Sequence, residues 1–166
     1  MYYLLILAVG AERLAELVVA DRNARWAFAH GGTEFGHRHY PVMVSIHAAL
    51  LFNCVVEVWL LHRPFIPALG WPMLAAALAS QGLRWWCIAT LGRRWNTLVI
   101  VMPQAPLVRR GPYRWLHHPN YVAVVVEGFA LPLVHTAWLT AIGFTLANAA
   151  VLRVRIRVEN AALGYR

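Results

Sequence analysis

The segment from Val108 to Tyr121, VRRGPYRWLHHPNY, concentrates side chains that could do chemistry. It combines arginines, tyrosines and the histidine pair His117 and His118 with turn-forming glycine and proline, and it sits between long apolar stretches. Imidazole and phenol groups can donate and accept hydrogen bonds, and guanidinium groups pair with anions. A block this basic is unsuited to a packed core, so the sequence predicts that it binds a polar ligand.

A second polar block follows near the C-terminus, in RVRIRVENAAL. Arg155 and Glu159 are four residues apart, so in a helix they share one face. The simplest interpretation is a helix that leaves a membrane with a collar of long basic side chains. The alternative is that both groups face the ligand of the first block. Composition alone favours the collar.

Metal and nucleotide chemistry have little support in the sequence. His37 and His39 are two residues apart, and His117 and His118 are adjacent, so neither pair matches the H-x-x-x-H spacing of a helical metal site. The sequence has no P-loop, no nucleophile elbow and no G-x-G-x-x-G motif. We therefore expect no metal site and no Rossmann-type site for a methyl donor.

The composition indicates that lipid surrounds the chain. Of 166 residues, 60% are hydrophobic and 13% are charged, whereas roughly a quarter of the residues of ordinary soluble domains are charged. A spanning helix needs about 20 largely apolar residues. Such segments run from Tyr2 to about Ala20, from about Pro41 to Leu61, from about Ile66 to Leu91, from about Tyr121 to Val134 and from about Ala137 to Leu152. Four crossings remain an alternative if one segment lies in the interface.

We therefore expect an all-α fold, a polytopic membrane bundle of about five transmembrane helices that forms a single domain over residues 1–166. Residues 1–91 would hold three helices, and residues 92–166 a cofactor-binding catalytic region with two further helices, the last running to the C-terminus. The prolines between Gly92 and Asn120 forbid one continuous helix there. We expect no regular element in this segment, and a connection of about 28 residues is usually functional.

The distribution of charge predicts an orientation. All 15 basic residues are arginines and the net charge is +8. Most lie at 22–38, 93–114 and 153–166, whereas the connection after the second apolar segment holds only Arg63. By the positive-inside rule the three basic regions are cytoplasmic. The N-terminus would then lie outside the cell (inner) membrane, with the C-terminus and the active site on the cytoplasmic side. Arginines that flank apolar spans also suit anionic lipid headgroups, so we expect no nucleic-acid partner.

The first apolar segment carries Glu12, Arg13 and Glu16 near its centre, so it does not resemble a signal peptide. Charges at the centre of a spanning helix cost about 3 kcal/mol each and usually face the bundle interior or one another. Arg13 and Glu16 are three residues apart, so we expect them to pair. A structural role is more expected for them than a role at the site.

The two polar blocks resemble the isoprenylcysteine carboxyl methyltransferase family of integral membrane methyltransferases. Its members share a pattern close to G-x-Y-x-x-x-R-H-P-x-Y and, downstream, R-x-x-x-E-E-x-x-L. The matching residues are Gly111, Pro112, Tyr113, His118, Pro119, Asn120, Tyr121, Arg155, Glu159 and Leu163. Two positions depart from the pattern: His117 stands where the family has arginine, and Asn160 stands where it has a second acid.

The resemblance implies S-adenosylmethionine as the cofactor. It places around it Leu107, Val108, Tyr113, His118, Pro119, Asn120, Tyr121 and Glu159. In this interpretation His118 donates to the methionine carboxylate, Glu159 accepts from the ammonium group, and tyrosine rings favour the nearby sulfonium cation. Arg155 matches the position that faces the substrate, so Arg155 and Glu159 are the expected catalytic residues.

The N-terminal half, with ERLAEL, RNARW and GGTEFGHRHYPVM, is similar to a bacterial branch of this family that accompanies type III polyketide synthases. That branch O-methylates alkylpyrones or alkylresorcinol-type products. The resemblance implies a lipidic small-molecule substrate with a long alkyl chain, reached through membrane lipid, and a functional link to such a synthase.

A 4-hydroxy-2-pyrone is largely ionised, so Arg155 would pair with its oxyanion, whereas a phenol would need a base, either His117 or His118. Three alternatives stay open. They are carboxyl methylation of an isoprenylated cysteine or another lipid, an NADPH-dependent sterol- or steroid-type membrane reductase with a similar R-H-P-N-Y block, and a non-catalytic lipid-binding membrane protein.

Overall fold

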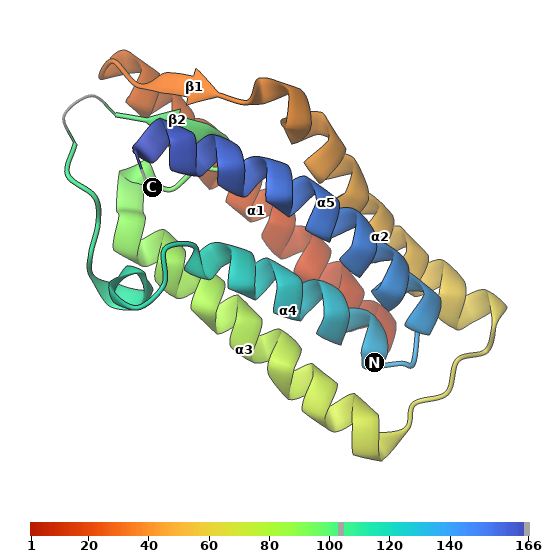
Figure 1. Ribbon diagram of the computed structural model, residues 1–166. Coiled ribbons are helices and arrows are strands. Elements are labelled where there is room, and N and C mark those ends of the chain that lie inside the picture. Colours follow the sequence, from red (N-terminus) through yellow and green to blue (C-terminus); the bar gives the residue numbers. More distant parts are fainter. Residues whose placement is uncertain (103–104, 165–166) are drawn as a thin grey trace.

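The computed structural model describes residues 1–102 and 105–164, and most of them are helical. Five long helices form one bundle, with the chain termini at opposite ends (Figure 1): α1 (Tyr2–Ala29), α2 (Tyr40–Leu60), α3 (Pro67–Leu91), α4 (Pro119–Leu133) and α5 (Trp138–Leu163). The shorter elements are η1 (His37–His39), η2 (Gly92–Arg94), η3 (Gly111–Arg114), β1 (Thr33–Phe35) and β2 (Val99–Val101). The all-α class is confirmed. Arg166, in the last basic region, lies outside the described residues.

Two helices run past the ends that the apolar segments predict. α1 continues to Ala29, past the end of its apolar segment near Ala20, and α5 continues past the end of its apolar segment near Leu152 to Leu163, as expected for a last helix that includes the basic block. Arginine and glutamate have good helix propensity, so a change from apolar to polar sequence does not end a helix. α5 ends where Gly164 adopts the left-handed conformation, with φ of 72°, which glycine tolerates best. The basic C-terminal block therefore lies on α5.

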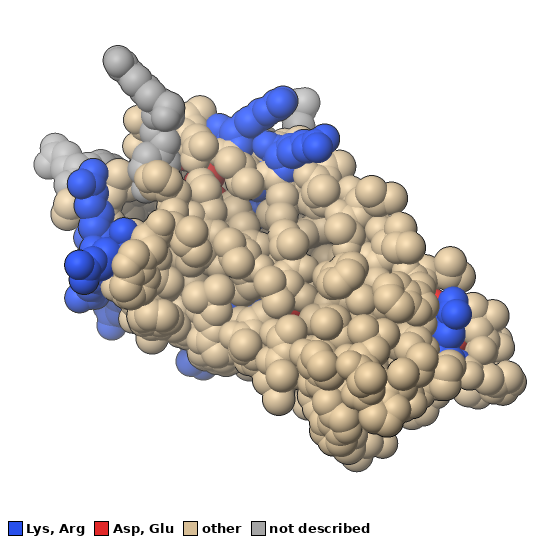
Figure 2. Space-filling model, turned by 60° about the horizontal axis from the view of Figure 1, so that its bottom comes forward, with Lys and Arg blue, Asp and Glu red and all other residues tan. Residues whose placement is uncertain are grey.

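The surface of the bundle suits a lipid environment. Two of the described helices, α2 and α5, are long and apolar enough to cross a membrane, and α4 is a shorter apolar helix. Large apolar side chains such as Leu14, Trp59 and Leu78 are exposed. Figure 2 shows a broad uncharged face, with most basic side chains at one end of the molecule and a smaller charged group at the other. The count of about five crossings stays a prediction.

The segment between α3 and α4 is more regular than expected. Strand β2 pairs antiparallel with β1, with Thr33 opposite Val101 and Phe35 opposite Val99. The expectation of a connection without any regular element is therefore wrong. Three-residue strands are too short to show a periodic pattern, and their pairing depends on residues far apart in the chain. The small sheet joins the polar segment after α1 to the one after α3.

Two contacts fix α5 in place. A Cβ atom at Gly128 of α4 would lie 1.9 Å from Cε1 of Phe144, so α4 and α5 can approach this closely only because that residue is glycine. At the start of α5, the Glu57 carboxylate accepts hydrogen bonds from the backbone N–H groups of Leu139 (3.2 Å) and Thr140 (2.7 Å). The first N–H groups of a helix lack intrahelical partners, so this carboxylate anchors the start of α5 to α2.

Candidate functional site

A cavity of about 420 Å³ reaches from strand β2 into the bundle, with walls from all five helices. Its volume lies in the range of small-molecule sites, roughly 300–1,000 Å³. Helix α5 contributes Asn148, Leu152, Arg155 and Glu159 to the wall. Spacings of three and four residues place these side chains on one helix face. The face that carries the second polar block is therefore turned toward the cavity and not only toward a membrane surface.

Arg155 is buried in this wall, with 4% of its surface exposed. Its Nη2 donates to the carbonyl oxygen of Thr97 (2.8 Å) and its Nε donates to the hydroxyl of Tyr121 (3.4 Å). Its Nη1 is buried and makes no hydrogen bond to the described residues. Leaving a buried donor unsatisfied costs about 1–3 kcal/mol, and more for a charged group. Arg155 is therefore suited to bind an oxygen of a ligand in the cavity.

Glu159 and His118 place opposite charges side by side. Oε1 of Glu159 lies 3.7 Å from Nδ1 of His118, and the other carboxylate oxygen accepts a hydrogen bond from the Tyr121 hydroxyl. On the far side of the ring, Nε2 of His118 lies 2.8 Å from Oδ1 of Asn160. Interaction with Glu159 raises the pKa of His118 above its ordinary value of 6.5, against the opposing effect of burial. Two acceptors around one ring favour the imidazolium form.

Aromatic rings form another part of the site. Tyr121 stacks on His118, with ring centroids 5.2 Å apart and planes 16° apart. Tyr113 also lines the cavity, and burial raises its pKa, so it stays a neutral phenol. Gly111 begins η3 with φ of 55°, and a Cβ there would lie 2.5 Å from Oγ1 of Thr90. Glycine thus lets η3 pack against α3, which brings Tyr113 to the cavity.

The remaining residues of the predicted cofactor set are less central. Asn120 lines the cavity, and its Oδ1 is buried without a hydrogen bond to the described residues. His117 also lines the cavity, and Pro119 is buried in the first turn of α4. Leu107 and Val108 lie in the irregular segment before η3, outside the cavity wall as far as the structure describes it. Their role stays a prediction.

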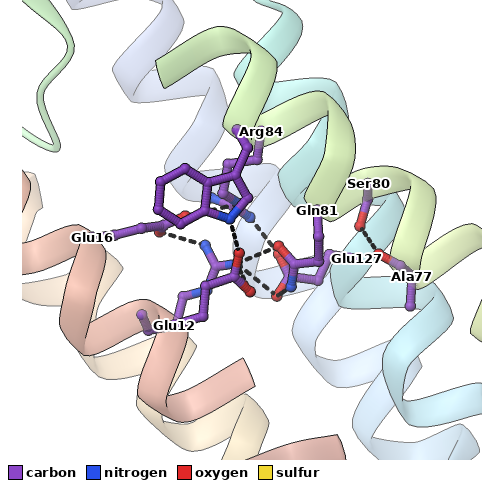
Figure 3. Close-up of polar contacts among 9 residues, drawn as sticks. Glu12, Glu16, Ala77, Ser80, Gln81, Arg84 and Glu127 are labelled. Carbon is purple, nitrogen blue, oxygen red and sulfur yellow. Dashed lines mark hydrogen bonds and ion pairs between the residues drawn. The ribbon is translucent and has the colours of Figure 1, made fainter. Parts of the chain in front are cut away.

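A second polar cluster lies deeper in the bundle, and only its pair on α1 is predicted by the sequence. The expected pair of Arg13 and Glu16 is confirmed, with Nη1 2.6 Å from Oε2. Arg84 of α3 and Glu127 of α4 also form an ion pair there. Figure 3 shows side chains of α1, α3 and α4 pointing toward one another in this cluster. Arg84 and Glu127 both lie within expected spans. A charge inside an apolar segment itself predicts a side chain that faces the bundle interior and pairs with another charge.

The fold is a helical bundle with a polar cavity toward one end, and two of its described helices are long and apolar enough to cross a membrane. The chain matches the isoprenylcysteine carboxyl methyltransferase (ICMT) family over residues 73–165, more than half of its length, and it belongs to this family. The matched region holds all the residues of the site on η3, α4 and α5. The protein is therefore a membrane methyltransferase of a family whose members generally use S-adenosylmethionine.

Two bacterial relatives extend the similarity over nearly the whole chain. The chain is 38% identical over 164 residues to "Uncharacterized protein YpbQ" of Bacillus subtilis, which covers 98% of this chain and 96% of that protein. It is 24% identical over 158 residues to an "Uncharacterized protein" of Haemophilus influenzae, which covers 93% of this chain and 90% of that protein.

Proposed function

We propose that this protein is an S-adenosylmethionine-dependent O-methyltransferase that acts at the membrane on the ring hydroxyl of a long-chain alkylpyrone or alkylresorcinol-type polyketide. One observation carries the proposal. Arg155 is a buried cation at the cavity wall, it has an N–H group without a hydrogen bond to the described residues, and it touches Tyr121, which in turn binds Glu159.

The chemistry of the donor set fits the cofactor. S-adenosylmethionine ends in an α-amino acid, which carries an ammonium group beside a carboxylate. Glu159 and His118 offer a carboxylate and an imidazolium-forming ring 3.7 Å apart. The carboxylate is complementary to the cofactor's ammonium group, and the imidazolium to its carboxylate. The buried Oδ1 of Asn120, which lacks a hydrogen bond to the described residues, adds an acceptor, and Tyr113 and Tyr121 add aromatic faces that favour a cation.

The mechanism assigns a role to each of these side chains. When bound, S-adenosylmethionine supplies an electrophilic methyl group on a sulfonium. His118 would donate to the carboxylate of the cofactor, and Glu159 would accept from its ammonium group. Arg155 would pair with the ionised oxygen of the acceptor and orient it. A 4-hydroxy-2-pyrone is ionised without help and requires no strong general base, whereas the phenolic proton of an alkylresorcinol would pass to a base, for which His117 at the cavity wall is the candidate. Alignment of the reacting groups and exclusion of water would then supply most of the rate acceleration.

A lipidic acceptor is supported by the walls of the cavity. Beyond the polar end the lining is largely apolar and includes Leu14 and Leu17 of α1 and Val44 and Ala48 of α2. Leu14 is also one of the large apolar side chains exposed on the bundle. An alkyl tail would lie against these side chains and leave the bundle between α1 and α2, where it meets lipid.

The distribution of arginine supports a location in the cell (inner) membrane. Basic side chains gather at one end (Figure 2), and the positive-inside rule assigns such an end to the cytoplasm. The N-terminus lies at the opposite end of the bundle (Figure 1), as five crossings require. We propose that the active site and the C-terminus are cytoplasmic. A type III polyketide synthase would be the functional partner that supplies the acceptor.

A direct contest between acceptors tests the proposed function. The purified protein is incubated with a labelled methyl donor and either a long-chain alkylpyrone or a farnesylated cysteine analogue. We expect faster methylation of the alkylpyrone. Faster methylation of the farnesylated cysteine would assign the protein to carboxyl methylation and leave its family unchanged.

A further inference from the structure

We propose that the cavity ends in a second polar subsite, formed by Glu16, Arg84 and Asn148, which binds a second oxygen on the ring of the acceptor. This inference rests on the proposed function, because it concerns the same cavity and the same acceptor. It defines the substrate as a ring with two oxygen groups, one held near Arg155 and the other held deeper in the bundle.

Each of the three side chains has polar atoms that make no hydrogen bond within the described part of the protein. Asn148 is 3% exposed and lines the cavity, and its side-chain amide makes no hydrogen bond to a described residue. Oε1 of Glu16 and Nε of Arg84 form an ion pair with each other at 3.6 Å but make no hydrogen bond within the described residues, and each of these residues is 4% exposed. Buried polar groups in proteins are nearly always satisfied. A carboxylate, a guanidinium and an amide on one cavity therefore indicate a polar occupant.

The other polar atoms of Glu16 and Arg84 are held by the polar cluster to which these two residues belong (Figure 3). Oε2 of Glu16 accepts from Nη1 of Arg13 at 2.6 Å, and Arg84 pairs with Glu127. Gln81 completes the cluster, because its Nε2 donates to Oε1 of Glu127 (3.3 Å) and its Oε1 accepts from Nη2 of Arg13 (2.6 Å). Groups fixed before binding lose little freedom when a ligand arrives. The cluster thus prepares Glu16 and Arg84 to meet one.

The formal charge of the cluster selects a neutral group. Three carboxylates, on Glu12, Glu16 and Glu127, face two guanidinium groups, on Arg13 and Arg84, which leaves one excess negative charge. An additional buried anion would be repelled, since charges interact strongly away from water. A hydroxyl can donate to Glu16, and a hydroxyl or carbonyl oxygen can accept from Arg84 or Asn148. A free carboxylate on the acceptor is disfavoured at this position.

The spacing along α5 leaves room for a ring with two meta oxygens between Asn148 and Arg155. Asn148 and Arg155 are seven residues apart, which corresponds to about 10 Å along a helix. Two meta oxygens lie about 5 Å apart, and a hydrogen bond of about 2.8 Å at each end gives a similar total. Leu152, between the two polar positions, lies against the cavity and would contact the ring itself.

The test compares a 5-alkylresorcinol with the 3-alkylphenol of the same chain length, which lacks one hydroxyl, in the full chain with a labelled methyl donor. After allowance for its two equivalent hydroxyls, we expect the resorcinol to have the higher kcat/KM. Asn148→Leu should lower kcat/KM for the resorcinol about threefold to tenfold, which is the effect of one lost hydrogen bond. The same substitution should leave kcat/KM for the phenol unchanged. Asn53→Leu, in a separate cavity between α2 and α5, is the matched control and should change neither.

The possible outcomes separate the two proposals. Binding of S-adenosylhomocysteine, measured by calorimetry, shows that each variant is folded. An equal loss on both acceptors, or no preference in the unmodified protein, would overturn the subsite and leave the proposed function intact. Methylation of neither acceptor, together with no methylation of the long-chain alkylpyrone, would refute the proposed function and the subsite with it, whereas methylation of the alkylpyrone alone would overturn only the subsite. If Asn148→Leu does not fold, the smaller Asn148→Ala and the preference of the unmodified protein decide the question.

Discussion

The hydroxyl of Tyr121 donates a hydrogen bond to the carboxylate of Glu159, and this bond joins the first turn of α4 to the end of α5. The same hydroxyl accepts from Nε of Arg155 at 3.4 Å. One phenol therefore touches both the carboxylate proposed to hold the cofactor and the cation proposed to hold the acceptor. Substitutions at Glu159 and Arg155 should therefore affect different properties, cofactor binding and turnover.

Glu159→Gln should weaken binding of both S-adenosylmethionine and S-adenosylhomocysteine. The amide keeps the size of the side chain but loses the charge that would face the cofactor's ammonium group. A hydrogen bond to a charged group contributes about 1.5–3 kcal/mol, so affinity should fall by roughly tenfold to over a hundredfold. Calorimetry in detergent measures this. Asp21→Asn, at an exposed ion pair with Arg25, serves as control, and an unchanged affinity of Glu159→Gln would remove this residue from the cofactor site.

Cofactor affinity should also depend on pH through His118. Its pKa is raised in the folded protein by Glu159, so the charged ring is fully present below its ordinary value of 6.5 and is lost as the pH rises through the raised value. Both the stability that it contributes and its attraction for a carboxylate should decline over that interval. His118→Gln should lack this decline. The measurement is the ratio of the two proteins' affinities across the pH range, which cancels titration of the cofactor itself, and a flat ratio would argue against an imidazolium at the site.

Arg155→Lys should reduce turnover and leave cofactor binding nearly unchanged. Lysine keeps the charge, but it cannot reach Thr97, Tyr121 and a ligand oxygen at once, because it lacks the fork of the guanidinium group. We expect kcat/KM for the acceptor to fall at least about tenfold, as for one charge-assisted hydrogen bond. Arg157→Lys, exposed on the same helix, is the matched control. Full turnover of Arg155→Lys would show that this side chain does not orient the acceptor.

The sequence predicted the α5 part of the site because helix geometry alone requires it. Arg155 and Glu159, four residues apart, must share a face whatever the bundle looks like. Whether that face meets lipid headgroups or a cavity depends on the neighbouring helices. Composition alone favours the basic collar, whereas the structure turns Arg155 and Glu159 toward the cavity. Thr97 could not be found this way, since it binds Arg155 through its backbone carbonyl.

The deeper polar cluster shows a different limit of sequence reasoning. Arg13 and Glu16 were visible as a local pair, but their partners Arg84 and Glu127 come from α3 and α4. Each of those two charges stands within an apolar stretch, which predicts burial and a partner without saying which partner. The burial of Asn148 could not be predicted at all, because a single amide among apolar residues is equally consistent with a surface position and with a buried one.

Arg84→Met should destabilise the fold more than any change at the protein surface. It removes a buried cation that lies between Glu16 and Glu127 and leaves their carboxylates without that partner. Breaking a buried ion pair in this way costs about 3–5 kcal/mol in soluble proteins. Thermal unfolding in detergent should show a clear decrease in Tm. Arg25→Met, at the exposed pair with Asp21, is the same substitution and should change Tm little; equal Tm values for the two variants would contradict a buried role for the cluster.

The rate of methylation should rise with the length of the acceptor's alkyl chain and then level off. Each methylene removed from water contributes about 0.8 kcal/mol. We therefore expect kcat/KM to rise up to about fourfold per methylene as long as the added methylenes contact the apolar wall of the cavity. Leu14→Trp fills part of that wall and should shift the plateau to shorter chains. Leu78→Trp, exposed on α3 and outside this cavity, should not. A homologous series of 5-alkylresorcinols assayed with all three proteins measures the effect, and the same profile for Leu14→Trp as for the unmodified protein would mean that the tail does not leave between α1 and α2.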